Sequence, residues 1–195
     1  MDSFAHTFRF GCIGESAIAT WFKHLGYSAL PVYEKEMNTG KGPQLFAPDR
    51  ELIAPDLLVF NKDTNKVFWI EAKHKSAFTW HRITQTWNTG IDQKHYDHYL
   101  SVNEVSPWPI WLLFLHEEGQ AKDTPPDKIS PTGLFGGELG FLNENIHHTH
   151  DNWGRSGMVY WAHETLKLVA SLNEVRAVCD TWNELEPQHE YALAS

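Results

Sequence analysis

Apolar residues near the start of the chain recur with helical spacing. They occupy one face of segment 12–26, at Ile18, Trp21, Phe22 and Leu25. Gly26 follows them, and glycine is the residue most often found just past a helix end. Residues 27–33 then look extended, with Pro31 indicating an edge position or a break. The polar residues 34–50 predict a loop.

Two apolar runs follow, and they flank a turn. Residues 52–60 and 66–73 are rich in strand-forming side chains, and the segment 61–65 between them is rich in turn formers. The pattern predicts a β-hairpin. If its turn is centred between residues 63 and 64, Asp56 lies directly opposite Glu71, with Cβ atoms roughly 4.5–5.5 Å apart.

Further elements are predicted in the second half of the chain. The segment Thr89–Asp92 resembles a capped helix start, and that helix would continue to about Glu104. Residues 110–115 are wholly apolar, as in a central strand buried on both faces. Residues 157–161 predict one more strand and 164–185 a helix.

These elements predict an α/β fold in which helices flank a central mixed sheet. A chain of 195 residues suffices for one sizeable core, so residues 1–195 are expected to form a single domain. The core would span about residues 10–115 and be completed by the strand and helix of 157–185. Residues 117–156, rich in Gly, Pro, Asn and His, would be a loop-rich insertion.

The net charge of −9 argues against a nucleic-acid partner until its distribution is considered. Residues 1–100 carry 11 Lys/Arg and 11 Asp/Glu, whereas residues 101–195 carry 5 and 14. All the excess acid therefore lies in the second half. If the acids Glu15, Asp56 and Glu71 bind a metal, the remaining face of the first half is mildly basic.

The sequence also bears on the compartment. No run reaches about 18 apolar residues, so no membrane span is expected. The first residues lack the basic and apolar regions of a secretory signal. The cysteines are Cys12 and Cys179, far apart and without a Cys-x-x-Cys pair. We expect reduced thiols and a cytoplasmic setting.

The predicted hairpin carries a candidate metal site. Two opposed carboxylates, Asp56 and Glu71, repel each other unless a cation lies between them. Glu71, Lys73 and Lys75 alternate along the second run, so they project from one face of the strand. Because the run before them is apolar on both faces, these charges enter a buried setting that needs compensation.

Mg²⁺ would supply that compensation, because it takes oxygen ligands and keeps several waters. Its ligands would be Asp56, Glu71 and the backbone carbonyl of Ala72, with Mn²⁺ as a substitute ion. A bound ion polarises a phosphodiester and lowers the pKa of a bound water. Lys73 would orient that water or stabilise the developing negative charge.

Pro55-Asp56, fourteen intervening residues and then Glu71-Ala72-Lys73 resemble the signature of the PD-(D/E)xK nucleases. This superfamily includes restriction-endonuclease-like and Holliday-junction-resolvase-like enzymes. Its core order of helix, strand, hairpin, helix and strand matches the order predicted for residues 10–115. The resemblance therefore implies a restriction-endonuclease-like core.

The resemblance also implies roles for residues outside the hairpin. Many members carry a glutamate in the first helix, and Glu15 in Gly14-Glu15-Ser16-Ala17 matches it. It would assist metal or water binding as an accessory catalytic residue. Many members also place a Gln or Tyr in the helix after the Glu-x-Lys strand, where Gln93, Tyr96 and Tyr99 fall.

Several other side chains are candidates for substrate or metal contact. The substrate-binding candidates are Lys75, Arg82, Gln93 and Tyr96. The aromatic residues Phe78, Trp80 and Trp87 have the chemistry to stack on bases, but packing on the sheet is the favoured reading. The group His147, His148 and His150 is read as a surface loop in preference to a transition-metal site.

The sequence thus predicts a Mg²⁺-dependent endo- or exodeoxyribonuclease, a hydrolase of phosphodiester bonds. DNA is the expected partner, RNA stays open, and a homodimer is compatible with cutting two strands. Two alternatives stay open as well. One is a non-catalytic nucleic-acid-binding protein on the same scaffold. The other is a protein–protein interaction module that uses the acidic second half.

Overall fold

The computed structural model describes residues 3–32, 43–151 and 156–185, with side chains described from residue 13 to residue 181. The helices are α1 (Ser3–His24), α2 (Gln93–Val105), α3 (Leu139–Glu144) and α4 (Leu172–Leu185), with a 3-10 turn η1 at His163–Thr165. The strands are β1 (Ser28–Pro31), β2 (Gln44–Phe46), β3 (Glu51–Ile53), β4 (Leu57–Asn61), β5 (Lys66–Lys75), β6 (Thr79–His81), β7 (Thr86–Asp92), β8 (Ile110–His116), β9 (Gly133–Glu138), β10 (His148–His150), β11 (Met158–Ala162) and β12 (Lys167–Ala170). Among the described helices, none is long and apolar enough to cross a bilayer.

A six-stranded sheet runs through the middle of the protein, in the order β1-β4-β5-β8-β9-β12. Strands β5 and β8 pair in parallel, and the other neighbours pair antiparallel. The sheet is therefore mixed, as predicted. Strand β8 is bordered by β5 and β9, and nearly all of its residues are buried. The predicted central strand at 110–115 is confirmed.

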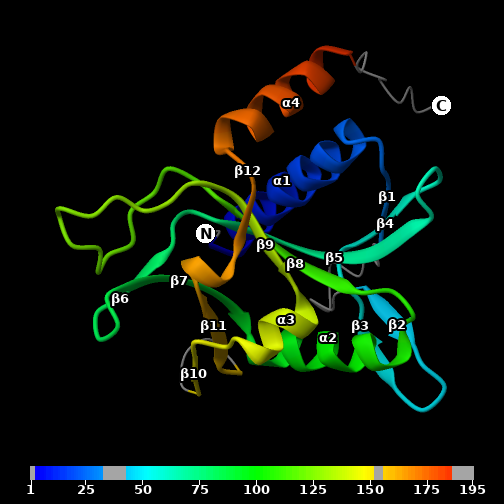
Figure 1. The fold of residues 1–195 in the computed structure, drawn as a ribbon, viewed down its shortest axis with the longest axis horizontal. Coiled ribbons are helices and arrows are strands. Elements are labelled where there is room, and N and C mark those ends of the chain that lie inside the picture. Colours follow the sequence, from blue (N-terminus) through cyan, green and yellow to red (C-terminus); the bar gives the residue numbers. More distant parts are fainter. Residues whose placement is uncertain (1–2, 33–42, 152–155, 186–195) are drawn as a thin grey trace.

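Helices cover both faces of this sheet (Figure 1). Helices α1 and α4 pack on one face, in a core that includes Ile18, Ile70, Ala72, Leu113 and Val175. Helices α2 and α3 lie on the other face, in a core that includes Trp69, Tyr99, Leu112, Leu142 and Trp161. Because side chains alternate along a strand, the even-numbered residues of β5 at 70 and 72 face α1 and the odd-numbered residue 69 faces α2.

A smaller sheet, β10-β11-β7-β6, joins the α2 side of the protein. Its apolar residues Trp87, Ile91 and Val159 enter the same core as α2. The chain passes from β5 into this sheet through Phe78, which is fully buried. The Phe78 ring stacks on that of His116 with centroids 3.6 Å apart, and its backbone N–H donates to Ser130 Oγ at 3.1 Å. The passage between the two sheets is therefore fixed by packing.

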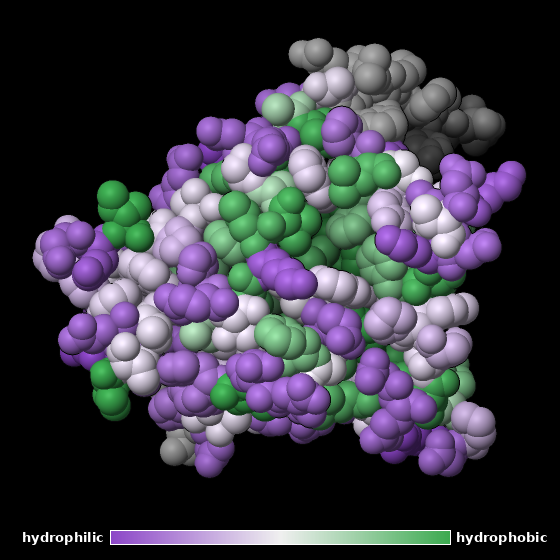
Figure 2. Space-filling model, viewed as in Figure 1, coloured by the Kyte–Doolittle hydropathy of each residue, from purple (hydrophilic) through white to green (hydrophobic). Residues whose placement is uncertain are grey.

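The surface seen from the same side is mostly hydrophilic (Figure 2). Hydrophobic side chains show on this face chiefly around strand β12 and helix α1. Leu168 of β12, for example, is 60% exposed.

The β4–β5 hairpin has the predicted register. Leu57 pairs with Ile70 and Asn61 with Lys66, which is the alignment that sets residue 56 across from residue 71. The turn is organised by Asn61, whose Oδ1 accepts hydrogen bonds from the backbone N–H groups of residues 63 and 64. Asn65 closes the turn with a φ of 52°, a conformation that asparagine tolerates better than most residues.

The predicted first helix is confirmed, but it begins earlier, at Ser3. Gly26 follows it with a φ of 82°, as expected for a glycine that ends a helix. Strand β1 lies at the sheet edge, where Pro31 predicted it. The predicted loop 34–50 lies partly outside the described residues, and within it residues 44–46 form strand β2.

Three other expectations were wrong in part. The helix expected from Thr89 begins only at Gln93, because Thr86–Asp92 pairs with β11 as a strand. The helix expected over 164–185 begins at Leu172, because Lys167–Ala170 pairs with β9. The segment 117–156 contains β9, which belongs to the main sheet, so it is more than loops and short strands. The strand predicted at 157–161 is confirmed as β11.

Candidate active site

Asp56 lies where strand β4 begins. Its carbonyl accepts a hydrogen bond from Val32 N at 2.9 Å, which ties the backbone to the chain leaving β1. Its Oδ2 accepts from Ala72 N at 2.9 Å, so the carboxylate is held against β5. The hairpin register and this hydrogen bond together place Asp56 beside Glu71, on the face that looks toward α2.

Glu71 is fully buried in the middle of β5, with 0% of its surface exposed. Its carboxylate contacts the ammonium of Lys73. Neither oxygen makes a hydrogen bond of ordinary geometry with a described residue, although Asp56 and Tyr99 lie close enough to act on the carboxylate. A buried carboxylate with unsatisfied acceptors is costly unless another group completes it. The carboxylate of Glu71 can therefore accept a further hydrogen bond or bind a cation.

The charges of the cluster act strongly on one another. Burial raises the pKa of Asp56, the neighbouring charge of Glu71 raises it further, and the result is about 7. Burial lowers the pKa of Lys73, but the charges of Glu71 and Asp56 outweigh it and raise that pKa above its usual value. Such perturbed groups, clustered on one strand and its neighbour, are typical of functional sites.

Glu15 approaches the cluster from helix α1, and its charge contributes to the raised pKa of Lys73. The preceding residue explains how the helix comes so close. A Cβ at Gly14 would lie 2.4 Å from His74 Cβ and 3.3 Å from His74 Cα. Only glycine fits there, so Gly14 lets α1 rest directly on β5, on the face opposite to that of Glu71.

A second group of polar side chains borders the cluster on the α2 side. Lys75 continues the row of Glu71 and Lys73 along β5. Asp92 ends β7, and His95 and Tyr99 lie one turn apart on α2 with ring centroids separated by 6.2 Å. The charges of Glu71 and Asp56 help burial to raise the pKa of Tyr99 well above its usual value.

The donor set fits a hard divalent ion that keeps several of its waters. Among the described residues there is no group of three or more His, Cys, Asp or Glu side chains arranged to hold a metal. The cluster instead offers two carboxylates and the nearby backbone of Ala72. Mg²⁺ is commonly bound through one or two carboxylates together with substrate phosphate, whereas a dedicated protein cage is unusual for it.

The structure brings together Asp56, Glu71, Ala72, Lys73 and, within electrostatic range, Glu15. The other substrate-binding candidates apart from Lys75 lie elsewhere. Arg82 is exposed and pairs with Asp123 at 2.8 Å.

Two of these candidates are on α2 but are engaged with other partners. Gln93 donates to Asp97 Oδ1 at 2.8 Å on the helix surface. Tyr96 is 3% exposed, belongs to the core, and its hydroxyl donates to Asn143.

The histidines at 147–150 were expected in a surface loop, but His148–His150 forms strand β10, because it pairs with β11, and His147 directly precedes it. His147 and His148 approach through their Nδ1 atoms at 2.7 Å, and the His148 ring stacks on that of Tyr160 with centroids 4.6 Å apart. The ring of His81, the last residue of β6, stacks on the ring of His148. Burial and the neighbouring His81 lower the pKa of His148 to about 4, so the ring of His148 is neutral at neutral pH.

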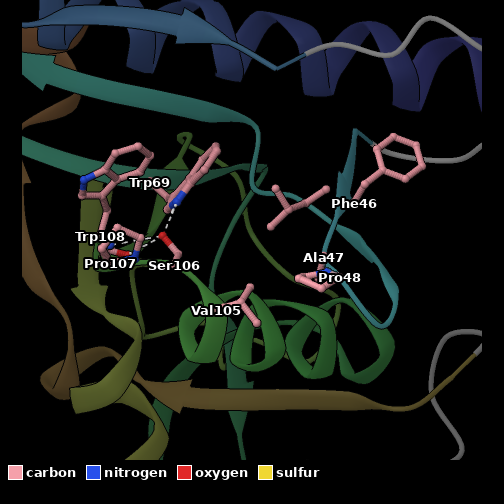
Figure 3. A pocket seen from close by; sticks show the side chains of 9 residues that line it. Phe46, Ala47, Pro48, Trp69, Val105, Ser106, Pro107 and Trp108 are labelled. Carbon is pink, nitrogen blue, oxygen red and sulfur yellow. Dashed lines mark hydrogen bonds between the residues drawn. The ribbon is translucent and has the colours of Figure 1, made fainter.

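A cavity of about 220 Å³ lies away from the acidic cluster, between β2 and the turn after α2 (Figure 3). Trp69, Trp108 and Phe46 line it, and Trp69 Nε1 donates to Ser106 Oγ at 2.9 Å. Its lining is apolar and contains no acid or lysine. Of the aromatic residues considered for base stacking, Phe78 and Trp87 are buried, in agreement with packing on the sheet.

Two residues of the candidate site went unrecognised in the sequence. Asp92 was taken for part of a helix cap, but its side chain makes no capping hydrogen bond, and His95 was not considered. A signal for both was present, because Asp92 and His95 lie at helical spacing from Tyr99 and therefore share a helix face with it. Placing the helix start three residues too early obscured it.

Comparisons with solved structures found chains of similar shape. No family model and no curated protein sequence matches the chain. Among solved structures, the Holliday junction resolvase Hjc of the archaeal hyperthermophile Archaeoglobus fulgidus is similar, with a TM-score of 0.46 and 8% identity, over 80% of this chain and 90% of that one. D212, a nuclease from a fusselovirus, is also similar, with a TM-score of 0.41 and 10% identity, over 95% of this chain and 98% of that one.

Proposed function

We propose that this protein is a metal-dependent nuclease that hydrolyses phosphodiester bonds in DNA. One observation carries the proposal: a fully buried glutamate, a neighbouring aspartate and a lysine converge at the end of a hairpin, and the glutamate oxygens are left without ordinary hydrogen bonds. A structural ion pair would need only Glu71 and Lys73. The additional carboxylate of Asp56 destabilises the cluster unless a cation joins it.

Asp56, Glu71 and the Ala72 carbonyl would hold Mg²⁺ or Mn²⁺, with Glu15 as an accessory carboxylate. The bound ion would supply a water of lowered pKa and polarise the phosphodiester. Lys73 remains protonated, because its pKa is raised, and its ammonium would donate hydrogen bonds to the attacking water or to the phosphate oxygen that gains charge. The carboxyl group of Asp56 would be ionised once the cation offsets the repulsion of Glu71.

A cleavage assay tests the proposal. Supercoiled plasmid, linear duplex, single-stranded and branched DNA would be incubated with Mg²⁺, with Mn²⁺ or with EDTA. Cleavage is expected with either ion and not with EDTA. Asp56→Asn and Glu71→Gln should each lower the rate by about 10²-fold or more, because each removes a charge that acts at the reacting phosphate.

Asp63→Asn is the matched control, because Asp63 is an exposed carboxylate in the turn of the same hairpin. It should cleave like the wild type. Absence of cleavage of all four substrates with both ions would overturn the proposal. Metal-independent DNA binding without cleavage would favour a non-catalytic nucleic-acid-binding protein instead, and neither binding nor cleavage would favour a protein-interaction module.

A further inference from the structure

Lys75 is a half-buried cation on β5, and Asp92 is an acidic residue whose charge acts on it. Among the described residues Lys75 makes no ion pair or side-chain hydrogen bond, although its strand is firmly placed, since its carbonyl accepts from Glu117 N at 2.9 Å. Burial and the nearby charge of Lys73 lower the pKa of Lys75 to about 8. A cation in such a position costs free energy unless something negative approaches it.

The position of Lys75 relative to the acidic cluster limits what that partner is. Lys73 and Lys75 share a face of β5 and are two residues apart, which is roughly 6–7 Å along a strand. Consecutive phosphates of a nucleic-acid strand have a comparable separation. If one phosphate is at Lys73 and the metal ligands, the next one along the same strand reaches Lys75.

His95 lies on the other side of the same space. It is half-buried in the first turn of α2, and the charges of Lys73, Asp92 and Asp56 all act on it. Burial, followed by the charge of Lys73, lowers its pKa, so its ring is neutral and offers one N–H donor. The charges of Lys73 and Asp92 act on both Lys75 and His95, so both residues border the space beside Lys73, and a lysine and a neutral histidine there suit an anion with several acceptor oxygens.

Resting on the proposed nuclease function, we propose that Lys75 and His95 form a second phosphate site, which binds the phosphodiester adjacent to the one that is cut. The substrate is accordingly a strand with at least two consecutive phosphates, and this site fixes its register over the metal ligands. Asp92, at the end of β7, lies close enough to act on both Lys75 and His95 and would orient them. Lys75 and His95 are positioning residues, since neither touches the reacting phosphate.

The test combines a protein change with a substrate change. An oligonucleotide carrying a single neutral methylphosphonate next to the scissile phosphate, on either side, would be compared with the all-phosphate strand. Wild-type protein, Lys75→Gln and His95→Gln would be assayed with Mn²⁺. Lys94→Gln is the matched control, because Lys94 belongs to the same first turn of α2 but is exposed.

For the wild type, the methylphosphonate on one side should raise KM by about tenfold, the size expected for one charge-assisted hydrogen bond. For Lys75→Gln the all-phosphate strand should already show that loss, and the methylphosphonate should add little to it. Lys94→Gln should respond to the methylphosphonate as the wild type does. The apparent affinity in Ca²⁺ should also depend less steeply on salt for Lys75→Gln, by about one released ion.

A small substrate with one phosphodiester, bis(p-nitrophenyl) phosphate, separates this site from the catalytic centre. It has no neighbouring phosphate, so the loss of activity caused by Lys75→Gln should be about tenfold smaller on it than on the all-phosphate strand. Equal sensitivity of the wild type and Lys75→Gln to the methylphosphonate would overturn the inference, as would an equal loss of activity on the two substrates. If the wild type cleaves nothing, the proposed function fails first, and the two failures are thereby distinguished.

Discussion

Replacement of Asp56 by asparagine should stabilise the metal-free protein at alkaline pH. In the wild type this carboxyl is held beside Glu71, with burial and the glutamate charge both opposing its ionisation. Asparagine keeps the shape and an oxygen that can accept from Ala72 N, as Asp56 Oδ2 does at 2.9 Å. Its amide N–H₂ can also donate to Glu71, whose oxygens lack ordinary hydrogen bonds.

The sign of the effect follows from proton binding. The pKa of Asp56 rises from 3.8 to about 7 on folding, so between these values the folded state holds a proton that the unfolded state has released. Folded-state proton binding therefore adds stability at low pH, and this contribution is lost as pH rises toward 7. At about 1.4 kcal/mol per pH unit, the loss from pH 5 to pH 8 is about 3 kcal/mol.

Urea denaturation in EDTA at pH 5, 6, 7 and 8, followed by tryptophan fluorescence, measures this. The amount by which the free energy of unfolding of Asp56→Asn exceeds that of the wild type should grow by about 3 kcal/mol between pH 5 and pH 8. Histidines remote from residue 56 contribute equally to both proteins and cancel in the difference, whereas His95, on which the charge of Asp56 acts, does not. Addition of Mg²⁺ at pH 8 should stabilise the wild type more than the variant, because it binds the ionised pair.

Asp63→Asn serves again as the control and should run parallel to the wild type at every pH. If Asp56→Asn also runs parallel to the wild type, the carboxyl of Asp56 ionises normally in the folded protein. The electrostatic argument for a cation at this position would then be refuted, whatever the cleavage assay shows.

Two further changes test the packing that supports the site. Gly14→Ala places a methyl group 2.4 Å from His74 Cβ, so α1 must move off β5; we expect a loss of about 1–3 kcal/mol in urea denaturation together with slower cleavage. Gly26→Ala, at a φ of 82° with open space around it, should cost about 1–2 kcal/mol but leave cleavage unchanged, and an equal effect of both changes on cleavage would contradict the role given to Gly14. Trp161→Phe removes the buried donor that bonds Leu142 O at 2.8 Å, and should lower the free energy of unfolding by about 1–3 kcal/mol; a change within error would show that the carbonyl finds another donor.

The sequence revealed the hairpin and its register because both are local. The turn residues at 61–65 and the alternating runs beside them lie within about twenty residues, and the observed pairing of Leu57 with Ile70 follows from them. The face shared by Asp56 and Glu71 then follows from strand geometry alone. The close approach of α1 was not predictable, because it depends on the contact of Gly14 with a residue sixty positions away.

The elements that were misassigned owe their form to distant partners. Thr86–Asp92 is a strand because β11, some seventy residues later, pairs with it, and Lys167–Ala170 is a strand because β9 does. Their local patterns allowed a helix, and tertiary pairing overrode it. The same error hid His95, since its place in the first turn of α2 depends on where β7 ends.

At Phe78 the chain passes, fully buried, from the large sheet to the small one, and this passage fixes the relative positions of the candidate-site residues that the two sheets carry. Glu71, Lys73 and Lys75 come from the large sheet, whereas Asp92 ends a strand of the small sheet and His95 lies in helix α2, which follows that strand. Because Phe78 is clamped between His116 and Ser130, the small sheet has little freedom to swing. The spacing across the centre is thus preorganised, so these side chains would keep their separation whether or not a substrate is bound.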